Sequence, residues 1–546
     1  MGKTDRILSG GITRRRKIVI LILLLIVIAA VFAQIIFRPD RKADLKVVVS
    51  GGVQGRLTYE KGRSLGYEGI SSLKTGRNVL LLDAGDCLGG SESAETGEGL
   101  GVINIMNQAG YDAMVPGRLD FVYGTDALGK LRSQSHFPII AANIKEASGR
   151  SYFEDYTIMN VDGVRIGLTG VTGALSSETA KSEDLTIEDP SRAVEEAIKK
   201  MGRNVDAVIV LANIYDDAEL SQIASLDNVA AVIQPASDKA SKKKKGSALI
   251  VSPGRYGSSA AVLDVNVTRD KASVKASFAD TSDISEPEKE SSTRQAVEKC
   301  LADMQDKASE KIGTIKISQE KTDAGLETEA VTEAETAAQT DESSGETSQS
   351  ETKTAKAAVH NEETPTGDYV ADAMVAAGSK YGVKAALIKD SDIKGTLRSG
   401  DVYRGDLNAL FDDDLYMVVC RITGGQLRNI LEDSFRDFPK AADFLQVSGL
   451  TFTYQSGTDI GSSVSDVTID FRELQDAQTY TVALTSDIAK SFGLDSKNSG
   501  KTIPMMSMGN TLCSYVSGRG GSQSAEAETS AEGESSEDES ERINIQ

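Results

Sequence analysis

The sequence predicts an α/β protein with two folded domains and an N-terminal transmembrane helix. Short apolar runs alternate with helical stretches over residues 46–280, and a second mixed region follows over residues 365–515. A twenty-residue segment without charge precedes both. At roughly 100–200 residues per domain, a chain of 546 residues has room for two or three domains.

The first region has the pattern of a layered α/β domain over residues 44–285. Its apolar runs are bounded by glycine and polar residues, which is typical of buried strands, and a helical stretch lies at 193–201. In such sheets ligands bind at loops beyond the carboxyl ends of the strands. The expected strands are 46–50, 79–83, 206–211, 229–233 and 249–251.

The second region is expected to form a domain over residues 362–517, after a charged connecting helix at 286–319. Residues 320–361 and 518–546 are rich in Glu, Ser, Thr and Ala, so they bury too little apolar surface to offset ordering entropy and are predicted to be disordered. Within the second domain, helices are expected at 367–377 and 424–433 and strands at 385–388, 415–421, 450–454 and 480–484.

The net charge of −21 belongs mostly to these two acidic segments. Residues 320–363 carry 12 acidic and 3 basic side chains, and residues 522–546 carry 8 acidic and 1 basic. The folded remainder is therefore only mildly acidic. Because binding to nucleic acid requires a basic face, we expect no nucleic-acid partner.

Residues 18–37 contain no charge and only one polar side chain, Gln34. A twenty-residue helix spans about 30 Å, the thickness of the hydrocarbon core. The basic segment 1–17 ends in Arg-Arg-Arg-Lys and is expected to stay in the cytoplasm, which places the body of the chain outside. Cleavage after Ala33 as a signal peptide is the competing interpretation, and it also places the body outside.

Histidine and cysteine are scarce and scattered. Of the two histidines, His360 lies in the acidic segment, so only His136 is available to a folded site. The four cysteines show no CxxC spacing, and neither a zinc site nor a disulfide framework follows from them.

Several motifs, taken in order, resemble the bacterial 5′-nucleotidase/UDP-sugar hydrolase family. The matching segments are LLLDAGD at 80–86 with GS at 90–91, GYDAM at 110–114, FPIIAANI at 137–144, GRYG at 254–257, ETPTGDYVADAM at 363–374, ITGGQL at 422–427 and VSGL at 447–450. Each piece is short, but their common order extends over more than 400 residues. The resemblance implies a four-layer αββα metallophosphatase-like domain followed by a 5′-nucleotidase-type C-terminal α/β domain.

The resemblance also implies hydrolysis of phosphate esters by two divalent ions, Mn, Mg, Zn or Co, held by imidazoles and carboxylates. One family ligand survives, as Asp86. At the other positions the family's Asp and His become Gly52 and Gln54, and a His becomes Asn213. The remaining changes lie at 117–122, where GNHEFD reads GRLDFV, and at 234–238, where both imidazoles of GGHSH are lost and Asp238 ends the segment.

Arg118 replaces the family's ligand Asn, and a guanidinium there would repel a metal ion by several kcal/mol. A salt bridge between Arg118 and Asp86 is the preferred interpretation, with two unrelated loop residues as the alternative. A rebuilt site of oxygen ligands for Mg²⁺ or Ca²⁺ is a further alternative. Its candidate ligands are Gln54, Asp83, Asp86, Asp120, Asn213 and Asp238.

The family's second domain sandwiches the nucleoside base between two Phe side chains. Phe411 falls at one of these positions and Asp413 replaces its companion Asn, whereas the second Phe is Ile488. The family's NGGIR loop becomes a segment that runs from Asp390 to Lys394, and Lys is no bidentate substitute for Arg. Phe411 is therefore expected to pack in the core, and nucleotide affinity to be weakened.

Three functions follow from these residues. The first is an inactive or very weak 5′-nucleotidase-like protein that binds or scaffolds at the cell surface, with no cofactor and an unknown protein partner. The second is an active metal-dependent hydrolase of nucleotides or UDP-sugars, and the third is a receptor for a nucleotide or sugar nucleotide. The lysine run 242–245 is expected to be a solvated loop, with attraction of an anionic envelope polymer as the alternative.

Overall fold

The computed structural model describes residues 23–24, 43–173, 185–202, 205–268, 271–317, 362–436, 444–455, 463–494, 502–520 and 542–545. Within these ranges no helix is both long enough and apolar enough to cross a bilayer. The predicted anchor at 18–37 lies outside them except for Leu23 and Leu24. The predicted linker at 320–361 also lies outside the described residues.

The N-terminal domain is built on two sheets that face each other. One has the strand order β13-β12-β1-β2-β3, and the other has the order β10-β11-β9-β8-β6-β5. Alternate side chains of both sheets, including Val47, Leu82, Ile209 and Leu211, form one buried cluster between them. In strands such as 79–83 and 229–233, successive aliphatic residues put apolar side chains on both faces. Both faces of these sheets are covered, so both must be apolar.

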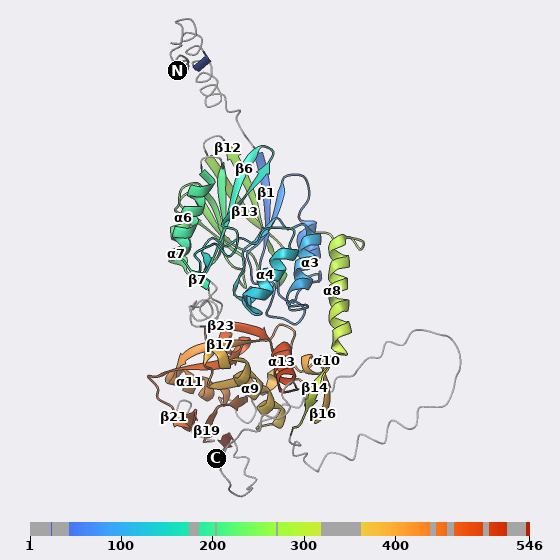
Figure 1. The fold of residues 1–546 in the computed structure, drawn as a ribbon, viewed down its shortest axis with the longest axis vertical. Helices are drawn as coiled ribbons and strands as arrows, with labels where there is room; N and C mark the ends of the chain where they lie inside the picture. The colour runs from blue at the N-terminus through green and yellow to red at the C-terminus, as the bar shows by residue number, and fades with distance from the viewer. Residues whose placement is uncertain are drawn as a thin grey trace, which may run out of the picture.

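Helices cover the two outer faces, which completes four layers. The helices α2, α3, α4 and α8 lie over the first sheet, where Tyr67, Ile103 and Met106 are buried. The helices α6 and α7 lie over the second sheet (Figure 1). Asp189 caps α6 and Pro190 occupies its first turn, a pairing of residues that favours helix initiation.

The elements of this domain have the following bounds: β1 Ala43–Ser50, α2 Gly66–Ser72, β2 Val79–Asp83, α3 Leu100–Ala109, β3 Ala113–Met114, α4 Gly124–Gln134, β4 Ile144–Glu146, β5 Tyr156–Val161, β6 Val164–Thr172, β7 Leu185–Ile187, α6 Pro190–Met201, β8 Ala207–Asn213, α7 Asp217–Ile223, β9 Val229–Ile233, β10 Ser241–Lys245, β11 Ala248–Ser252, β12 Ala260–Thr268, β13 Lys271–Ala279 and α8 Ser292–Ala308.

The C-terminal domain has a five-stranded sheet of order β18-β15-β22-β17-β23 with a hydrophobic core on each face. The helices α9, α10 and α13 cover one face, and α11, α12 and a small sheet of order β21-β20-β19-β24 cover the other. The bounds are β14 Lys311–Ile315, α9 Pro365–Ala377, β15 Ala385–Lys389, β16 Gly400–Tyr403, α10 Arg404–Asn408, β17 Tyr416–Thr423, α11 Gly424–Ser434, β18 Leu445–Ser448, β19 Leu450–Tyr454, β20 Val464–Ile469, β21 Arg472–Glu473, β22 Thr479–Thr485, α12 Ser486–Ser491, β23 Thr502–Ser507, α13 Met508–Gly520 and β24 Ile543–Ile545.

Three expectations about single elements are corrected. Residues 286–319 are not one helix, because α8 ends at Ala308 and β14 pairs with β16. The lysines at 242–245 lie in the edge strand β10, where side chains are exposed and charge discourages further pairing. In the segment predicted to be disordered, α13 extends to Gly520 and β24 pairs in parallel with β19.

Hydrogen bonds join the two domains. Asp413 accepts bonds from the amide of Ser93 at 3.1 Å and from its hydroxyl at 3.0 Å, and Arg56 pairs with Asp414 at 3.3 Å. The approach is close, because a Cβ on Gly55 would lie 2.1 Å from the Asp413 carboxylate. The helix α8 runs from the face of α3 to α10, alongside both domains (Figure 1).

The buried carboxylate of Glu95 is a second junction between the domains. It accepts bonds from the amide and hydroxyl of Ser507, each at 2.8 Å, and from Asn510 at 2.8 Å. Burial raises the pKa of Glu95. The C-terminal domain is thereby held directly against the loops of the N-terminal domain.

Candidate functional site

The loops that follow β1, β2, β3 and β8 carry the residues that the sequence singles out, and they lie on the side of the C-terminal domain (Figure 1). This is the carboxyl edge of the parallel strands β1, β2 and β3, and β8 ends beside it. Its placement follows the rule for ligand sites in parallel sheets.

The buried Asp120 carboxylate holds the backbone of two of these loops. It accepts amide N–H bonds from Asp86 at 2.9 Å, Cys87 at 2.9 Å, Leu88 at 2.8 Å and Gly117 at 2.6 Å. Burial, and then the neighbouring Asp86, raise the pKa of Asp120. Both oxygens are committed to the backbone, so Asp120 has a structural role.

Asp86, the one retained family ligand, is also engaged by the protein. Its Oδ1 accepts a bond from the amide of Leu119 at 3.0 Å, and its Oδ2 accepts bonds from the hydroxyl of Tyr215 at 3.2 Å and from Asn213 Nδ2 at 3.3 Å. Asp86 has a φ of 61°, in the left-handed region that a residue other than glycine rarely adopts. Such backbone strain is typical of a functional loop. Here the strained residue is one whose carboxylate already accepts hydrogen bonds from the protein.

Asp83 lies fully buried at the end of β2. It accepts bonds from the Ser50 hydroxyl at 2.6 Å and from the amide of Gly85 at 2.8 Å. Burial raises its pKa from 3.8 to about 6. The three carboxylates of this region, those of Asp83, Asp86 and Asp120, are therefore all bonded within the protein.

The preferred salt bridge between Arg118 and Asp86 is wrong, because no ion pair joins them although both residues are described. Tyr215 lies between them instead. Its hydroxyl bonds to Asp86, and its ring lies 5.2 Å from the Arg118 guanidinium carbon. Arg118 Nη1 donates to Thr502 of the C-terminal domain at 3.2 Å, and its Nε has no hydrogen-bond partner.

Two buried amide oxygens in the same loops also have no partner in the described part of the chain, Gln54 Oε1 and Asn213 Oδ1. The Asn213 amide nitrogen donates to the carbonyl of Ala84 at 2.8 Å, which fixes its orientation. Native proteins rarely leave buried polar atoms unsatisfied. Together with Arg118 Nε, these atoms give the loops unused hydrogen-bonding capacity.

Asp238 does not join the site. Its side chain is 64% exposed and lies 3.7 Å from Arg255. Arg255 itself extends over Gly52, where its Cγ lies 3.6 Å from the position of a Cβ. The arginine thus lies beside the space left by the loss of the family's metal-binding Asp.

The residues present do not fit a pair of divalent ions. No group of three or more His, Cys, Asp or Glu side chains is arranged to hold a metal within the ranges that the structure describes. The carboxylates of Asp83 and Asp120 bond to neighbouring protein groups, and Arg118 brings positive charge beside Asp86. The rebuilt Mg²⁺ or Ca²⁺ site of oxygen ligands stays a prediction; of its candidate ligands, Asp238 lies 3.7 Å from Arg255 with its side chain 64% exposed.

The nucleoside half of the site is absorbed into the core. Phe411 is buried among Leu407, Leu415 and Leu512, and Ile488 is buried in the cluster on the other face of the sheet. This burial favours packing as the role of Phe411. Neither side chain offers a face to a base.

The polar residues of this half also have structural partners. Asp390 is buried and accepts a bond from Gln446 Nε2 at 3.0 Å, and Lys394 pairs with Asp412. Asp413 joins the domains through Ser93. His136 is exposed on the surface, away from these loops.

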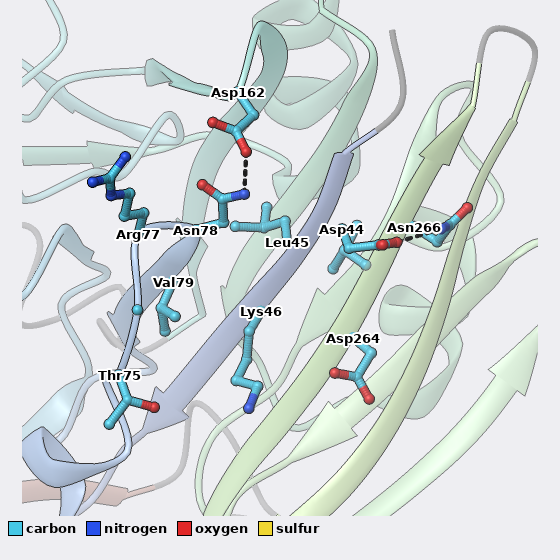
Figure 2. Close-up of a pocket in the computed structure, with 12 residues that line it drawn as sticks. Asp44, Leu45, Lys46, Thr75, Arg77, Asn78, Val79, Asp162, Asp264 and Asn266 are labelled. Carbon is cyan, nitrogen blue, oxygen red and sulfur yellow. Dashed lines mark hydrogen bonds between the residues drawn. The ribbon is translucent and has the colours of Figure 1, made fainter.

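A pocket of about 620 Å³ lies at the opposite edge of the first sheet, where β1 and β2 begin. Figure 2 shows two hydrogen-bonded pairs among its side chains, in which Asn266 donates to Asp44 at 2.5 Å and Asn78 donates to Asp162. Because the candidate site lies where β1 and β2 end, this pocket is separate from it.

Tyr215 and Arg255 also belong to the site, although neither was predicted from the sequence. Both follow recognisable positions: Tyr215 stands two residues after the Asn at the end of β8, and Arg255 lies within the GRYG turn. A sequence gives no indication that the ring of Tyr215 lies against Arg118 or that Arg255 extends over Gly52.

Comparison with known proteins identifies relatives of both halves. Residues 338–494 match the family described as "5'-nucleotidase, C-terminal domain". Endonuclease YhcR of Bacillus subtilis is 24% identical over 451 residues, which are 76% of this chain and 33% of that protein. The 5'-nucleotidase of Rattus norvegicus is 35% identical over 149 residues, 25% of each chain.

The chain thus spans about a third or less of the length of these curated relatives. Among solved structures, the NAD nucleotidase NadN of Haemophilus influenzae has a TM-score of 0.64 at 13% identity, covering 93% of this chain and 100% of that one. That likeness shows a shared two-domain fold.

Proposed function

The chain belongs to the 5′-nucleotidase family, and from that relationship we propose a non-catalytic member that acts as a binding or scaffold protein at the cell surface. The observation that carries the proposal is the commitment of Asp83, Asp86 and Asp120 to hydrogen bonds within the protein. Two-metal hydrolysis needs ligands free to bridge two ions and generate a hydroxide. Here those ligands are replaced, and the retained Asp86 already accepts hydrogen bonds from Leu119, Asn213 and Tyr215.

The surface location is part of the same proposal. The uncharged segment 18–37 would hold the chain in the membrane, and the basic residues before it would keep the N-terminus in the cytoplasm. Protease added to intact cells should then degrade the folded domains. Protection of the domains until the cells are lysed would contradict this orientation.

Catalysis is tested by phosphate release from AMP and UDP-sugars by the full-length protein in detergent, with Mn²⁺, Co²⁺, Zn²⁺ or Mg²⁺ added in turn. We expect release at the level of the protein-free blank. The Asp86→Ala variant is the matched control. Turnover in the natural protein that this substitution abolishes would refute the proposal.

A metal-dependent hydrolase of nucleotides or UDP-sugars is the second candidate. It is supported by the relatives, whose names denote an endonuclease and a 5'-nucleotidase, and by the retention of Asp86. A divalent ion would be its cofactor. The same assay separates the two candidates.

A further inference from the structure

The small sheet of the C-terminal domain is completed by a strand from a distant part of the chain. β24 pairs in parallel with β19, from Phe452 opposite Ile543 to Tyr454 opposite Ile545. We propose that this edge of β19 is a recognition groove for an extended peptide of another protein, in which an arginine is followed directly by an aliphatic residue. The chain's own segment 542–545 occupies the groove as a tethered ligand of the same kind.

The groove is separate from the candidate functional site. Figure 1 labels β19 at the end of the C-terminal domain that faces away from the N-terminal domain, whereas the loops of the candidate site lie at the junction of the two domains. A peptide would therefore bind here whether or not those loops hydrolyse a phosphate ester, and this binding goes beyond the proposed function.

The sequence before the segment does not explain why the segment binds there. Residues 521–541, which lie outside the described ranges, contain eight acidic side chains, no basic one and no apolar side chain larger than alanine. Fully extended, these 21 residues would reach at most about 70 Å, so their length alone does not direct the segment to one edge. The contacts of segment 542–545 itself must therefore supply the recognition.

Arg542 is held by two carboxylates of α9 and a backbone carbonyl. Its Nη1 donates to the carbonyl of Val447 at 2.7 Å and lies 3.3 Å from Asp368 Oδ1 and 3.2 Å from Asp372 Oδ1, and its Nη2 donates to Asp372 Oδ2 at 3.3 Å. The Ser448 hydroxyl donates to Asp372 at 2.6 Å and orients it. A guanidinium matches both oxygens of a carboxylate at once, which an ammonium does not. The groove therefore selects arginine over lysine.

Backbone bonds hold the segment without regard to its side chains. The Phe452 amide donates to the Arg542 carbonyl at 3.1 Å, and the Ile543 amide donates to Glu363 Oε2 at 3.1 Å. Glu363 stands just before α9, so the segment 363–372 supplies this carboxylate and the two that hold the arginine. In peptide binding by strand addition, main-chain bonds supply affinity and side-chain pockets supply specificity.

The pocket for the aliphatic residue is part of the core. Ile543 is 3% exposed and belongs to the cluster that contains Phe452 and Tyr454. The two residues that follow are different, because Asn544 is exposed and Ile545 is 39% exposed. Recognition by side chains therefore depends on the arginine and on the residue directly after it.

The charges favour a basic partner over the chain's own segment. The carboxylates of Asp368 and Asp372 give the groove negative charge, and four of the five residues before Arg542 are acidic as well. Like charges closer than about 8 Å repel at physiological salt, so acidic residues next to Arg542 weaken the docking of the chain's own segment. A peptide with basic residues before the same pair of arginine and aliphatic residue would be attracted instead and would displace it.

The test is fluorescence anisotropy of a labelled synthetic peptide, Lys-Lys-Arg-Ile-Asn-Ile, titrated with the full-length protein in detergent. The chain's own segment competes at an effective concentration on the order of 1 mM, so the natural protein should bind the peptide weakly. Ile543→Asp should release the segment and strengthen peptide binding at least tenfold. In that background Asp372→Asn should weaken binding at least tenfold. The matched control is Asp401→Asn, which changes a 49% exposed carboxylate paired with Lys311 and should leave binding unchanged.

Changes in the peptide test the same features from the side of the ligand. Lysine in place of its arginine, or aspartate in place of its first isoleucine, should each weaken binding at least tenfold. Two glutamates in place of its two lysines should weaken binding at least threefold, because they restore the repulsion that the chain's own segment experiences.

Thermal unfolding of each variant shows whether it folds. If Ile543→Asp does not fold, Arg542→Ala takes its place, because it releases the segment without placing a charge in the core. Absent binding to the folded release variant, equal affinity after Asp372→Asn, or equal affinity for the lysine and glutamate peptides would each overturn the proposal. Dimers of the natural protein that form with rising concentration in sedimentation and are lost in Arg542→Ala would also overturn it, because a second copy of the chain would then be the occupant.

Discussion

The loops of the N-terminal domain and the region of Phe411 in the C-terminal domain correspond to the two halves of one family site, and they have changed differently. In the first half, polar groups remain and some are unsatisfied, as Arg118 Nε and Gln54 Oε1 show. In the second half, Phe411 is core and Asp413 joins the domains. The first half therefore keeps unused hydrogen-bonding groups, whereas the residues of the second half pack in the core or join the domains.

This difference has a physical origin. An aromatic ring that loses its stacking partner lowers its free energy by burial, so Phe411 needs no ligand to be stable. A guanidinium or a buried amide cannot be satisfied by apolar neighbours. Buried polar groups that lack a protein partner therefore keep the capacity to bind a ligand, whereas a buried aromatic ring does not.

Phe411→Ala should have the largest effect. Truncation of a buried Phe leaves a cavity and costs about 3–5 kcal/mol of unfolding free energy. Urea unfolding measures this, with Phe411→Leu as the milder control. A loss below about 1 kcal/mol, together with weaker AMP binding, would show that the ring stacks on a ligand, and the comparison of the two halves would fail.

Asp120→Ala should cost somewhat less, about 3 kcal/mol, because four buried amides lose their acceptor and each unsatisfied donor costs about 1–3 kcal/mol before water enters. Asp238→Ala is the control on an exposed carboxylate and should change stability by less than about 0.5 kcal/mol. Equal effects in the two variants would contradict the structural role of Asp120.

Asp83 should make stability depend on pH. Its folded-state pKa of about 6 lies above the ordinary 3.8, so the folded protein binds this proton more tightly, and the contribution of Asp83 to stability is present below pH 4 and lost as the pH rises through 6. The rise in the pKa of Asp83 corresponds to a change of about 3 kcal/mol at most in the free energy of unfolding. Because neighbouring groups can adjust to the charge, we expect a measured change of about 2 kcal/mol. Urea unfolding of Asp83→Asn at pH 4 and 7 should show this dependence removed relative to the natural protein, and parallel pH profiles would contradict it.

Asp413→Ala should have the smallest effect, about 1 kcal/mol, through the loss of two hydrogen bonds between the domains. Amide exchange at Ser93 should accelerate about fivefold, as this free energy requires. Unchanged protection at Ser93 would show that Asp413 does not hold the domains together.

Some features of the fold could be predicted from local pattern. The strands 79–83 and 229–233 were predicted with the bounds that the structure has, because the first is an aliphatic run that ends at Asp83 and the second is wholly aliphatic. The strand β24 was missed, because three residues after an acidic segment have no periodicity, and they are held by pairing with β19 and by the burial of Ile543 in the core. The lysine strand β10 was also missed, because a run of four lysines has no alternation of polar and apolar residues.

The sequence by itself determined that the chain has only two histidines, and the order of its motifs, compared with the family it resembles, identified Asp86 as the one retained ligand. Only the tertiary structure decided what the remaining groups do. Whether Arg118 meets Asp86 or Tyr215, and whether Asp120 faces an ion or four amides, depends on loops brought together from distant parts of the chain. The position of these loops relative to one another decides which side chains meet, and a local sequence pattern does not reveal that position.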